Sequence, residues 1–497
     1  MFETAELGRA VSKKDFEEQE RVLRTELLQA QRDLIAAKIP VVVIVSGVEG
    51  AGKGSLVNRL SSWLDTRAME VHVFWDSTDE ERERPRWWRF WRTLPPRGRI
   101  GVLFGSWYTH PIVERAFERM DAGEFEHAMH RIKDFERTLT LDGALFVKFW
   151  AHLSKEAQHD RWVADEASGR KWEVSPLAEE YGSRYDAFLR TSEQAIRLTD
   201  TGTSPWYLVE AANPRYRDLT VGRTLLAAIR ARLKPTVSPA PPTAPGVVDP
   251  GPTTTVLDRV DLGCSLTKND YKDRLDHWQR ELNRLSWAAY RERRSTVAVF
   301  EGWDAAGKGG AIRRVIAAVD ARLARVITIA APSDEERAQH YLWRFWRQIP
   351  RDGRLTIYDR SWYGRVLVER LEGFARQDEW MRAYNEINTF EEQLVEHGTI
   401  VAKFWVHISP EEQLRRFEER QKIPWKMHKI TEEDWRNRDK WDDYAVAVND
   451  MVQHTSTTAA PWVLVPGNDK RYARVKILET LCRSLATALD EDLALPE

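Results

Sequence analysis

Cysteine is nearly absent from this chain, because its 497 residues include only Cys264 and Cys482. Two cysteines exclude a disulfide framework and a cysteine-rich zinc site, and they are typical of a reducing compartment. No apolar run approaches the roughly 20 residues that span a bilayer, and the first residues lack the apolar core of a signal peptide. We therefore expect a cytoplasmic protein that does not associate with membranes.

The chain also lacks an excess of charge of either sign. It has 75 Lys and Arg against 77 Asp and Glu, which gives a formal net charge of −2. No field of the whole chain favours nucleic acid, and no nucleic-acid-binding module is recognised, so nucleic acid is not an expected partner. Any site for a polyanion must be a local concentration of Lys and Arg. Hydrophobic residues make up 42%, which is typical of a globular protein.

One unit occurs twice in the sequence. The stretches "SGVEGAGKGS" and "EGWDAAGKGG" place Lys53 and Lys308 at a separation of 308 − 53 = 255 residues. The same offset aligns three further pairs of motifs: "WRFWRTLPPRGR" with "WRFWRQIPRDGR", "SWY" with "SWY", and "KFWAHLS" with "KFWVHIS". Ordered matches at one spacing predict the tandem duplication of a whole domain. We expect domains over 1–232 and 256–497, joined by a Pro- and Thr-rich linker over 233–255.

Each half alternates apolar runs with helical patterns. In the second half the predicted strands are "TVAVF", "RVITIAA", "RLTIYD", "TIVAKFWVHI" and "PWVLV", and a helix is predicted over 311–323. Strands separated by helices imply a mostly parallel sheet that is covered on both faces. The predicted fold class is therefore α/β, with two tandem P-loop kinase-like domains whose ligands lie at the carboxyl ends of the strands.

The Gly-rich stretch after "TVAVF" satisfies most of the P-loop pattern. Its glycines let several backbone N–H groups and the start of the next helix face an anion, and Lys308 adds a positive charge. A tight strand-to-helix connection is the alternative, but the preceding strand and the adjacent Lys favour phosphate binding. The loop residues expected to bind phosphate are Gly302, Ala305, Ala306, Gly307, Gly309 and Gly310.

The residue after Lys308 is unusual for a P-loop. Gly309 stands where a Ser or Thr hydroxyl normally helps to hold magnesium, so the ion needs other hard oxygen ligands. Asp304 lies inside the loop, and Asp359 ends the strand "RLTIYD". A turn residue at the end of a strand is the alternative for Asp359. We expect both carboxylates to help to hold the metal ion.

Three arginines are predicted to neutralise charge on the transferring phosphoryl group, because guanidinium groups pair with phosphate oxygens. These residues are Arg344, Arg360 and Arg365. For any one of them alone, a surface salt bridge is the alternative. The aromatic residues of "LWRFWR" are more consistent with packing than with base stacking.

A basic segment over 414–444 follows the fourth predicted strand of the second half. Around Pro424 the string "QKIPWKMHK" has no acid to balance its bases, which favours a mobile lid over bound phosphates. A solvated helix face with i,i+4 ion pairs is the alternative. The predicted lid residues are Arg416, Arg420, Lys422 and Lys426.

Taken together, "GWDAAGKGG", "LWRFWRQIPRDGR", "YDRSWYGR", "KFWVHIS" and "PWVLVPGNDK" resemble the polyphosphate kinase 2 family, in its two-domain branch. The resemblance implies a fold similar to thymidylate kinase, with Mg²⁺ or alternatively Mn²⁺ as cofactor. It implies transfer of a phosphoryl group from inorganic polyphosphate to a nucleoside monophosphate, chiefly AMP, which becomes ADP. It also implies that Asp304, Lys308 and Asp359 are essential and that Arg360 lies close to the transferred phosphate. The resemblance leaves open whether the protein forms a homo-oligomer.

The first half departs from this pattern. Glu49 stands at the place of Asp304, whereas the second motif loses its charges: Phe104 replaces Asp359, Gly105 replaces Arg360 and His110 replaces Arg365. We therefore predict that residues 1–232 are catalytically silent and serve as structural support or as a weak polyphosphate-binding unit. An ATP-dependent nucleotide kinase and a non-catalytic binding protein are the two alternatives for the whole chain.

Overall fold

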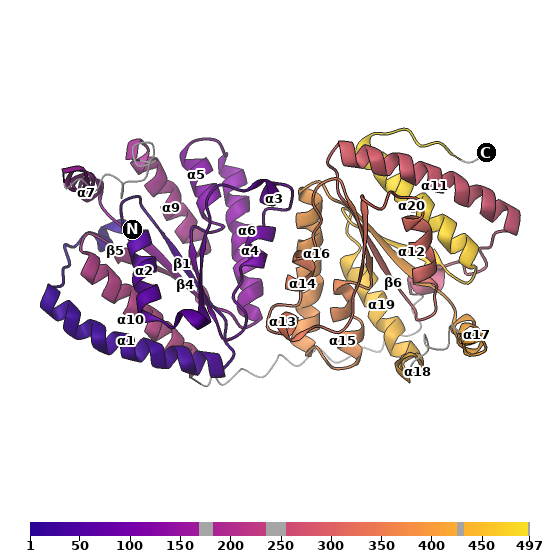
Figure 1. Cartoon of the computed structure of the whole chain (residues 1–497), viewed down its shortest axis with the longest axis horizontal. Helices are drawn as coiled ribbons and strands as arrows, with labels where there is room; N and C mark the ends of the chain where they lie inside the picture. The colour runs from indigo at the N-terminus through magenta and orange to yellow at the C-terminus, as the bar shows by residue number, and fades with distance from the viewer. Residues whose placement is uncertain (168–181, 235–254, 425–431, 496–497) are drawn as a thin grey trace. The chain divides into compact units, whose positions relative to one another are not determined.

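The computed structural model describes residues 1–167, 182–234, 255–424 and 432–495. Most of the predicted linker and the predicted lid residue Lys426 lie outside these ranges. Contacts between Cα atoms divide the chain into two compact units, shown in Figure 1. The N-terminal unit comprises residues 1–77, 89–239 and 333–340, and the C-terminal unit comprises 78–88, 240–332 and 341–497. No helix among the described residues is long and apolar enough to cross a membrane.

The N-terminal unit contains a parallel sheet of five strands in the order β2-β3-β1-β4-β5. The strands are β1 (Val41–Gly47), β2 (Met69–Val73), β3 (Ile100–Phe104), β4 (Leu145–His152) and β5 (Trp206–Glu210). The described helices up to residue 233 are α1 (Lys13–Ala36), α2 (Lys53–Trp63), α3 (Asp79–Arg82), α4 (Trp88–Arg92), α5 (Thr109–Ala116), α6 (Ala122–Leu141), α7 (Lys155–Ala167), α9 (Tyr185–Thr199) and α10 (Pro214–Leu233).

The C-terminal unit repeats this order as β7-β8-β6-β9-β10, again with every pairing parallel. Its strands are β6 (Thr296–Gly302), β7 (Ala324–Thr328), β8 (Leu355–Asp359), β9 (Ile400–His407) and β10 (Trp462–Pro466). The described helices after residue 255 are α11 (Lys268–Arg291), α12 (Lys308–Ile316), α13 (Asp334–Arg337), α14 (Trp343–Trp346), α15 (Val368–Leu371), α16 (Gln377–Glu396), α17 (Pro410–Gln421), α18 (Glu432–Asp439), α19 (Trp441–Thr455) and α20 (Lys470–Leu489). All five predicted strands and the α/β class are confirmed.

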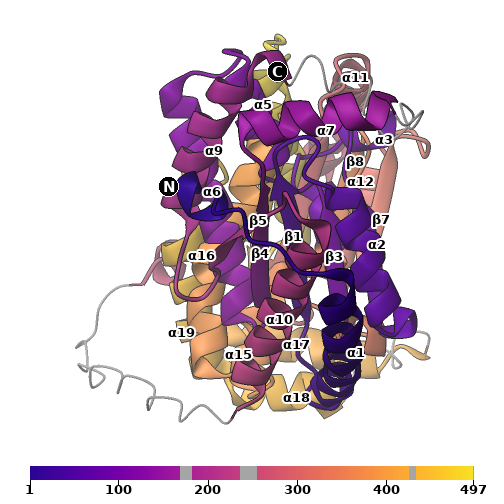
Figure 2. The same ribbon diagram turned by 90° about the vertical axis from the view of Figure 1, so that its left-hand side faces the viewer.

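Helices cover both faces of each sheet, as expected for parallel strands joined by crossover helices. In the N-terminal unit α1, α2 and α10 pack together against the sheet, and α6 contacts β4 from the other side (Figures 1 and 2). In the C-terminal unit α11, α12 and α20 form the corresponding layer, and α16 lies on the opposite face against β9. The central strands β1 and β6 are thereby buried, and each leads into a Gly-rich loop.

The helix predicted over 311–323 begins earlier and ends at Ile316. The chain turns at Asp320, whose carboxylate accepts the backbone N–H of Arg322 and whose carbonyl accepts that of Leu323. Such a local side-chain bond competes with the helix and favours a turn. The turn brings the chain back to the edge strand β7.

The shared "SWY" and "KFW" motifs contribute a tyrosine and a lysine to a buried network in each unit. The ammonium of Lys403 on β9 donates to Glu391 of α16 at 2.7 Å and to the Tyr363 hydroxyl at 2.8 Å, and it also bonds the carbonyl of Thr455 in α19. The N-terminal unit repeats this network around Lys148. A buried charge is tolerated only with such partners, so the network ties the central sheet to its covering helices.

Candidate active site

The loop between β6 and α12 depends on two glycines with left-handed backbone angles. Gly302 has φ 147°, and a Cβ there would lie 2.5 Å from the carbonyl oxygen of Val406. Gly307 has φ 112° and forms the N-cap of α12. Only glycine permits both the close approach of β6 to β9 and the turn into the helix. The loop therefore presents the N-terminal end of α12 at the carboxyl edge of the sheet.

Lys308 is the first residue of α12, and its ammonium lies back over the loop. It donates to the carbonyl oxygens of Gly302 and Trp303. Burial lowers the pKa of Lys308, and the carboxylate of Asp304 acts in the opposite direction. The ammonium is thus held among the backbone groups that would surround a phosphate.

The structure brings three of the four predicted catalytic residues to one cleft of about 40 Å³, lined by Asp304, Lys308 and Arg360 among others. The Arg360 guanidinium lies 3.3 Å from Asp304, and the amide of Asn437 donates to the other carboxylate oxygen of Asp304 at 3.0 Å. Asp359 lies next to Arg360 at the end of β8, is partly exposed, and acts electrostatically on Lys308. Acidic and basic groups therefore alternate around the loop.

Two residues of this site have backbone angles that ordinary side chains avoid. Ala305 has φ 62° and Arg360 has φ 64°. The counterparts of both in the N-terminal unit, Gly50 and Gly105, are glycines with φ 78° and 73°. The backbone path is therefore common to the two units, and the C-terminal unit carries side chains at positions where they cost about 1–2 kcal/mol each. Such strain is characteristic of functional sites.

The donor set fits a magnesium ion that is shared with substrate. The described residues contain no group of three or more His, Cys, Asp or Glu that could hold a metal by themselves. Mg²⁺ is usually bound through one or two carboxylates, with phosphate oxygens and waters completing its shell. Asp304 and Asp359 offer such a pair, and a carboxylate has about four acceptor positions. The contacts of Asp304 with Arg360 and Asn437 therefore leave room for a metal bond.

The other two predicted phosphate-binding arginines make contacts with protein groups. Arg365 lies 3.1 Å from Glu369 and stacks on the ring of Tyr341 at 4.5 Å. Arg344 of α14 donates to the carbonyl of Ala330 at 2.9 Å. Neither lines the cleft around Lys308. Their contact with phosphate stays a prediction.

The predicted lid residues differ in their surroundings. Arg416 is 1% exposed, and its guanidinium donates to the loop carbonyls of Ala305 and Ala306 at 3.0 and 2.7 Å. It therefore supports the loop in this structure. Arg420 is partly exposed near the end of α17, and Lys422 is exposed just beyond it. Contact of these side chains with a ligand stays a prediction.

Sequence reasoning did not single out Glu301, Asn437 and Lys470. Glu301 is 5% exposed, accepts the Ser361 hydroxyl at 2.8 Å, and has a pKa raised by burial. Lys470 is the first residue of α20, and its side chain lies beside Gly307. Its pKa is lowered to about 8, mainly by burial and secondly by the nearby positive charge of Arg416. Lys470 ends the quoted motif "PWVLVPGNDK", which was the signal available. Glu301 begins the quoted stretch "EGWDAAGKGG" and Asn437 lies in the basic segment 414–444, but neither segment indicated a role for these two side chains.

The loop of the N-terminal unit keeps its shape without the charged partners. The Lys53 ammonium donates to the carbonyls of Gly47 and Val48 at 3.1 and 2.9 Å and lies 3.3 Å from Glu49. Phe104 and Gly105, which replace Asp359 and Arg360, line a cavity beside Lys53. That the unit is catalytically silent stays a prediction.

The parallel sheets, the Gly-rich loop after the central strand and the Asp304–Lys308–Arg360 cluster define a P-loop kinase-like protein. The family model described as polyphosphate kinase 2 matches residues 10–236 and 265–492. The chain belongs to the polyphosphate kinase 2 family.

Relatives and a solved structure agree with this assignment over the whole length. The chain is 49% identical to a polyphosphate:AMP phosphotransferase of Pseudomonas aeruginosa, across 99% of this chain and all of the relative. It is 47% identical to a protein of the same name from Pseudomonas syringae pv. tomato, across 99% of both. A crystal structure from P. aeruginosa PA01, described as a candidate polyphosphate kinase 2, superimposes with a TM-score of 0.89 at 48% identity, covering 99% of this chain and all of that chain.

Proposed function

We propose that the C-terminal unit transfers the terminal phosphoryl group of inorganic polyphosphate to AMP. The observation that carries this proposal is the convergence of Asp304, Lys308 and Arg360 on one cleft beside the loop. Phosphoryl transfer needs positioning and charge neutralisation rather than covalent catalysis. The names of the two relatives, at 49% and 47% identity over the full length, support polyphosphate and AMP as the substrates.

In this reaction an oxygen of the AMP phosphate attacks the terminal phosphorus of polyphosphate. The bond from that phosphorus to its bridging oxygen breaks, and the bridging oxygen keeps the electron pair. The products are ADP and a polyphosphate shorter by one phosphoryl unit. The second pKa of a phosphate monoester is about 6, so the acceptor is mostly dianionic at neutral pH and needs no strong general base.

The two substrates are polyanions, so the site must offset their repulsion. The Lys308 ammonium and the Arg360 guanidinium supply fixed positive charge at the loop. Asp304 and Asp359 would hold Mg²⁺, or alternatively Mn²⁺, which when bound neutralises charge on phosphate oxygens. Asp304 also orients Arg360 through their contact.

The test is incubation of the full chain with Mg²⁺, AMP and long-chain polyphosphate in the absence of ATP. We expect ADP to form, and to disappear in Lys308→Ala while persisting in the matched variant Lys53→Ala. Absence of ADP would refute the proposal. ADP that forms only when ATP is supplied would instead identify an ATP-dependent nucleotide kinase. Equal loss in both Lys variants would contradict the assignment to the C-terminal unit.

A further inference from the structure

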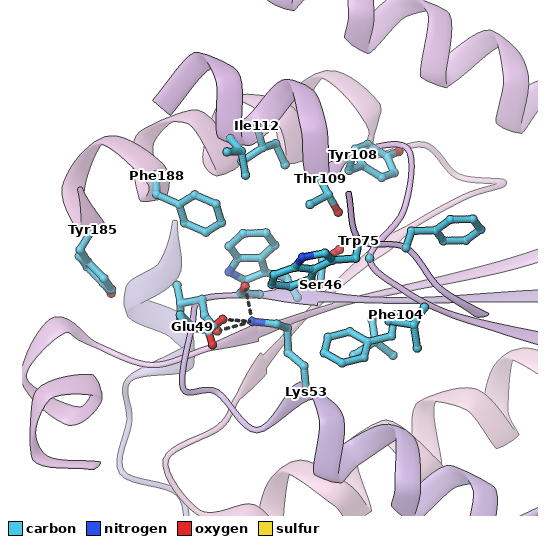
Figure 3. A pocket seen from close by; sticks show the side chains of 18 of the residues that line it. Ser46, Glu49, Lys53, Trp75, Phe104, Tyr108, Thr109, Ile112, Tyr185 and Phe188 are labelled. Carbon is cyan, nitrogen blue, oxygen red and sulfur yellow. Dashed lines mark hydrogen bonds and ion pairs between the residues drawn. The ribbon is translucent and has the colours of Figure 1, made fainter. Parts of the chain in front are cut away.

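The N-terminal unit contains a cavity of about 270 Å³ beside its Gly-rich loop (Figure 3). Figure 3 shows Phe104, Ile112, Tyr185 and Phe188 around this space, with Lys53 at one side. The corresponding cleft of the C-terminal unit measures about 40 Å³. An apolar cavity of about 150 Å³ is sufficient to bind benzene. The N-terminal cavity is therefore large enough for a ring system bigger than benzene.

One large side chain beside the C-terminal cleft has a much smaller counterpart at the N-terminal cavity. In the C-terminal unit the indole of Trp303 stacks on Trp441 at 3.6 Å between ring centroids, with an angle of 8° between the planes. At the 255-residue offset the counterpart of Trp303 is Val48, which lines the cavity. The space that an indole fills in one unit is thus unfilled in the other.

The charge at the cavity is balanced. Lys53 is its cationic lining residue, and its ammonium is already bonded to two loop carbonyls and to Glu49. The positions that correspond to Asp359 and Arg360 hold Phe104 and Gly105. Among the described residues that line the cavity, no Lys or Arg besides Lys53 is available to pair with a polyanion. An uncharged occupant is therefore favoured over a phosphate.

A buried indole N–H group in the cavity wall indicates that a bound molecule would carry a hydrogen-bond acceptor. Trp150 lines the cavity and is 1% exposed, and its indole Nε1 has no hydrogen-bond acceptor among the described residues. Its counterpart Trp405 donates to His407 at 3.5 Å. Indole N–H groups usually find a partner when they are buried, and a donor left without one costs about 1–3 kcal/mol. A ligand with an acceptor would supply the missing bond.

We propose that this cavity binds an uncharged, planar heteroaromatic molecule of up to two fused rings, which offers a ring nitrogen or carbonyl acceptor to the Trp150 N–H. Flat rings fit because the walls are largely aromatic, including Phe104, Tyr185 and Phe188. Nucleobases belong to this chemical class. The site is separate from phosphoryl transfer, since the described residues that line it include none of those that line the Lys308 cleft.

The test uses ¹⁹F NMR titration of the full chain with 6-fluoroquinoline, which is uncharged at pH 7.5 and carries a ring nitrogen. 2-Fluoronaphthalene has the same fused shape without the acceptor and serves as the matched ligand. We expect saturable 1:1 binding of the quinoline, about fivefold tighter than that of the naphthalene, which is the effect of a hydrogen bond worth about 1 kcal/mol. Trp150→Phe should remove this preference and leave naphthalene binding unchanged.

A second variant tests the cavity itself. Val48→Trp restores the indole found at the corresponding position of the other unit, and we expect it to abolish binding of both probes. Lys308→Ala should bind them as the unchanged chain does, and ADP formation in Val48→Trp reports whether its C-terminal unit is folded. The proposal is overturned if the quinoline does not bind saturably, if Val48→Trp still binds it, or if Trp150→Phe keeps the preference. Displacement of the quinoline by polyphosphate would also overturn it.

Discussion

The left-handed backbone at Arg360 leads to a prediction that separates stability from activity. Replacing Arg360 by Ala or by Gly removes the guanidinium and its contact with Asp304 equally. The two variants differ in the Cβ atom alone, which remains at φ 64° in Arg360→Ala. A side chain in this conformation costs about 1–2 kcal/mol. The greater freedom of glycine in the unfolded chain offsets about 0.4–1 kcal/mol of that difference.

The midpoints of these two ranges differ by about 0.8 kcal/mol, so we expect Arg360→Gly to be more stable than Arg360→Ala by about 0.5–1 kcal/mol. For a domain of 150–250 residues such a difference raises the melting temperature by roughly 1–4 °C. Both variants should lose ADP formation by about 10²-fold or more, because a fixed charge at the transferring group is removed. Differential scanning calorimetry of the full-length variants, together with the ADP assay, measures both quantities.

Equal melting temperatures for the two variants, or a higher one for Arg360→Ala, would refute the reasoning about backbone strain. Retained ADP formation in either variant would refute the role given to the guanidinium. Arg360→Lys serves as the control for charge, since it keeps both the strain and a cation. We expect its free energy of unfolding to match that of Arg360→Ala to within about 1 kcal/mol, which is the most that an exposed ion pair contributes.

Three further predictions concern other parts of the molecule. Lys403→Ala leaves the buried carboxylate of Glu391 without its cation and should lower the free energy of unfolding of the C-terminal unit by about 3–5 kcal/mol in calorimetry. Lys148→Ala should destabilise the N-terminal unit instead and preserve ADP formation. An unchanged melting temperature in either variant would contradict this prediction. Phe104→Asp and Gly105→Arg together restore the missing charges of the N-terminal unit, but we expect no ADP from this double variant in a chain whose C-terminal site is inactivated. The reason is that a Cβ at position 105 would lie 2.4 Å from the backbone carbonyl oxygen of Phe74. Recovered ADP formation would show that the two units differ in activity only because of these charges. The pKa of Lys470 is lowered to about 8, so its side chain is charged below that pH and neutral above it. The KM for polyphosphate should therefore rise by up to about tenfold between pH 7 and 9, and Lys470→Arg should flatten this dependence because Arg stays charged. An unaltered pH profile in that variant would show that Lys470 does not cause the dependence.

Much of the architecture could be predicted because it depends on local patterns. Apolar runs separated by helical patterns identified all five strands of the C-terminal unit, and the spacing of Gly302, Gly307 and Lys308 identified the loop. The end of α12 was misplaced because helical periodicity continues through Ala317 and Ala318, whereas the turn at Asp320 depends on a side-chain hydrogen bond. Periodicity carries no information about such a bond.

The candidate site could be predicted only in part. Asp304, Lys308 and Arg360 stand in recognisable motifs, and the sheet brings those motifs together because parallel strands end at the same edge. Glu301 and Asn437 come from a strand and a helix far apart in the chain, and neither stands in a known spacing. Their contacts with Ser361 and Asp304 arise only when these elements pack.

The sequence by itself determined the duplication, the α/β class and the two Gly-rich loops. It also determined that the first half lacks counterparts of Asp359 and Arg360. Each of these features depends only on residue order and spacing. Only the tertiary structure decided that Arg416 is buried against the loop, that Arg360 has a strained backbone, and that the first half contains a cavity. Burial, backbone angles and volume depend on which side chains from distant segments occupy the same space. Trp303 illustrates the point: its replacement by Val48 is a single apolar substitution in the sequence, but in the structure the Trp303 indole stacks on Trp441 whereas Val48 lines a cavity of about 270 Å³.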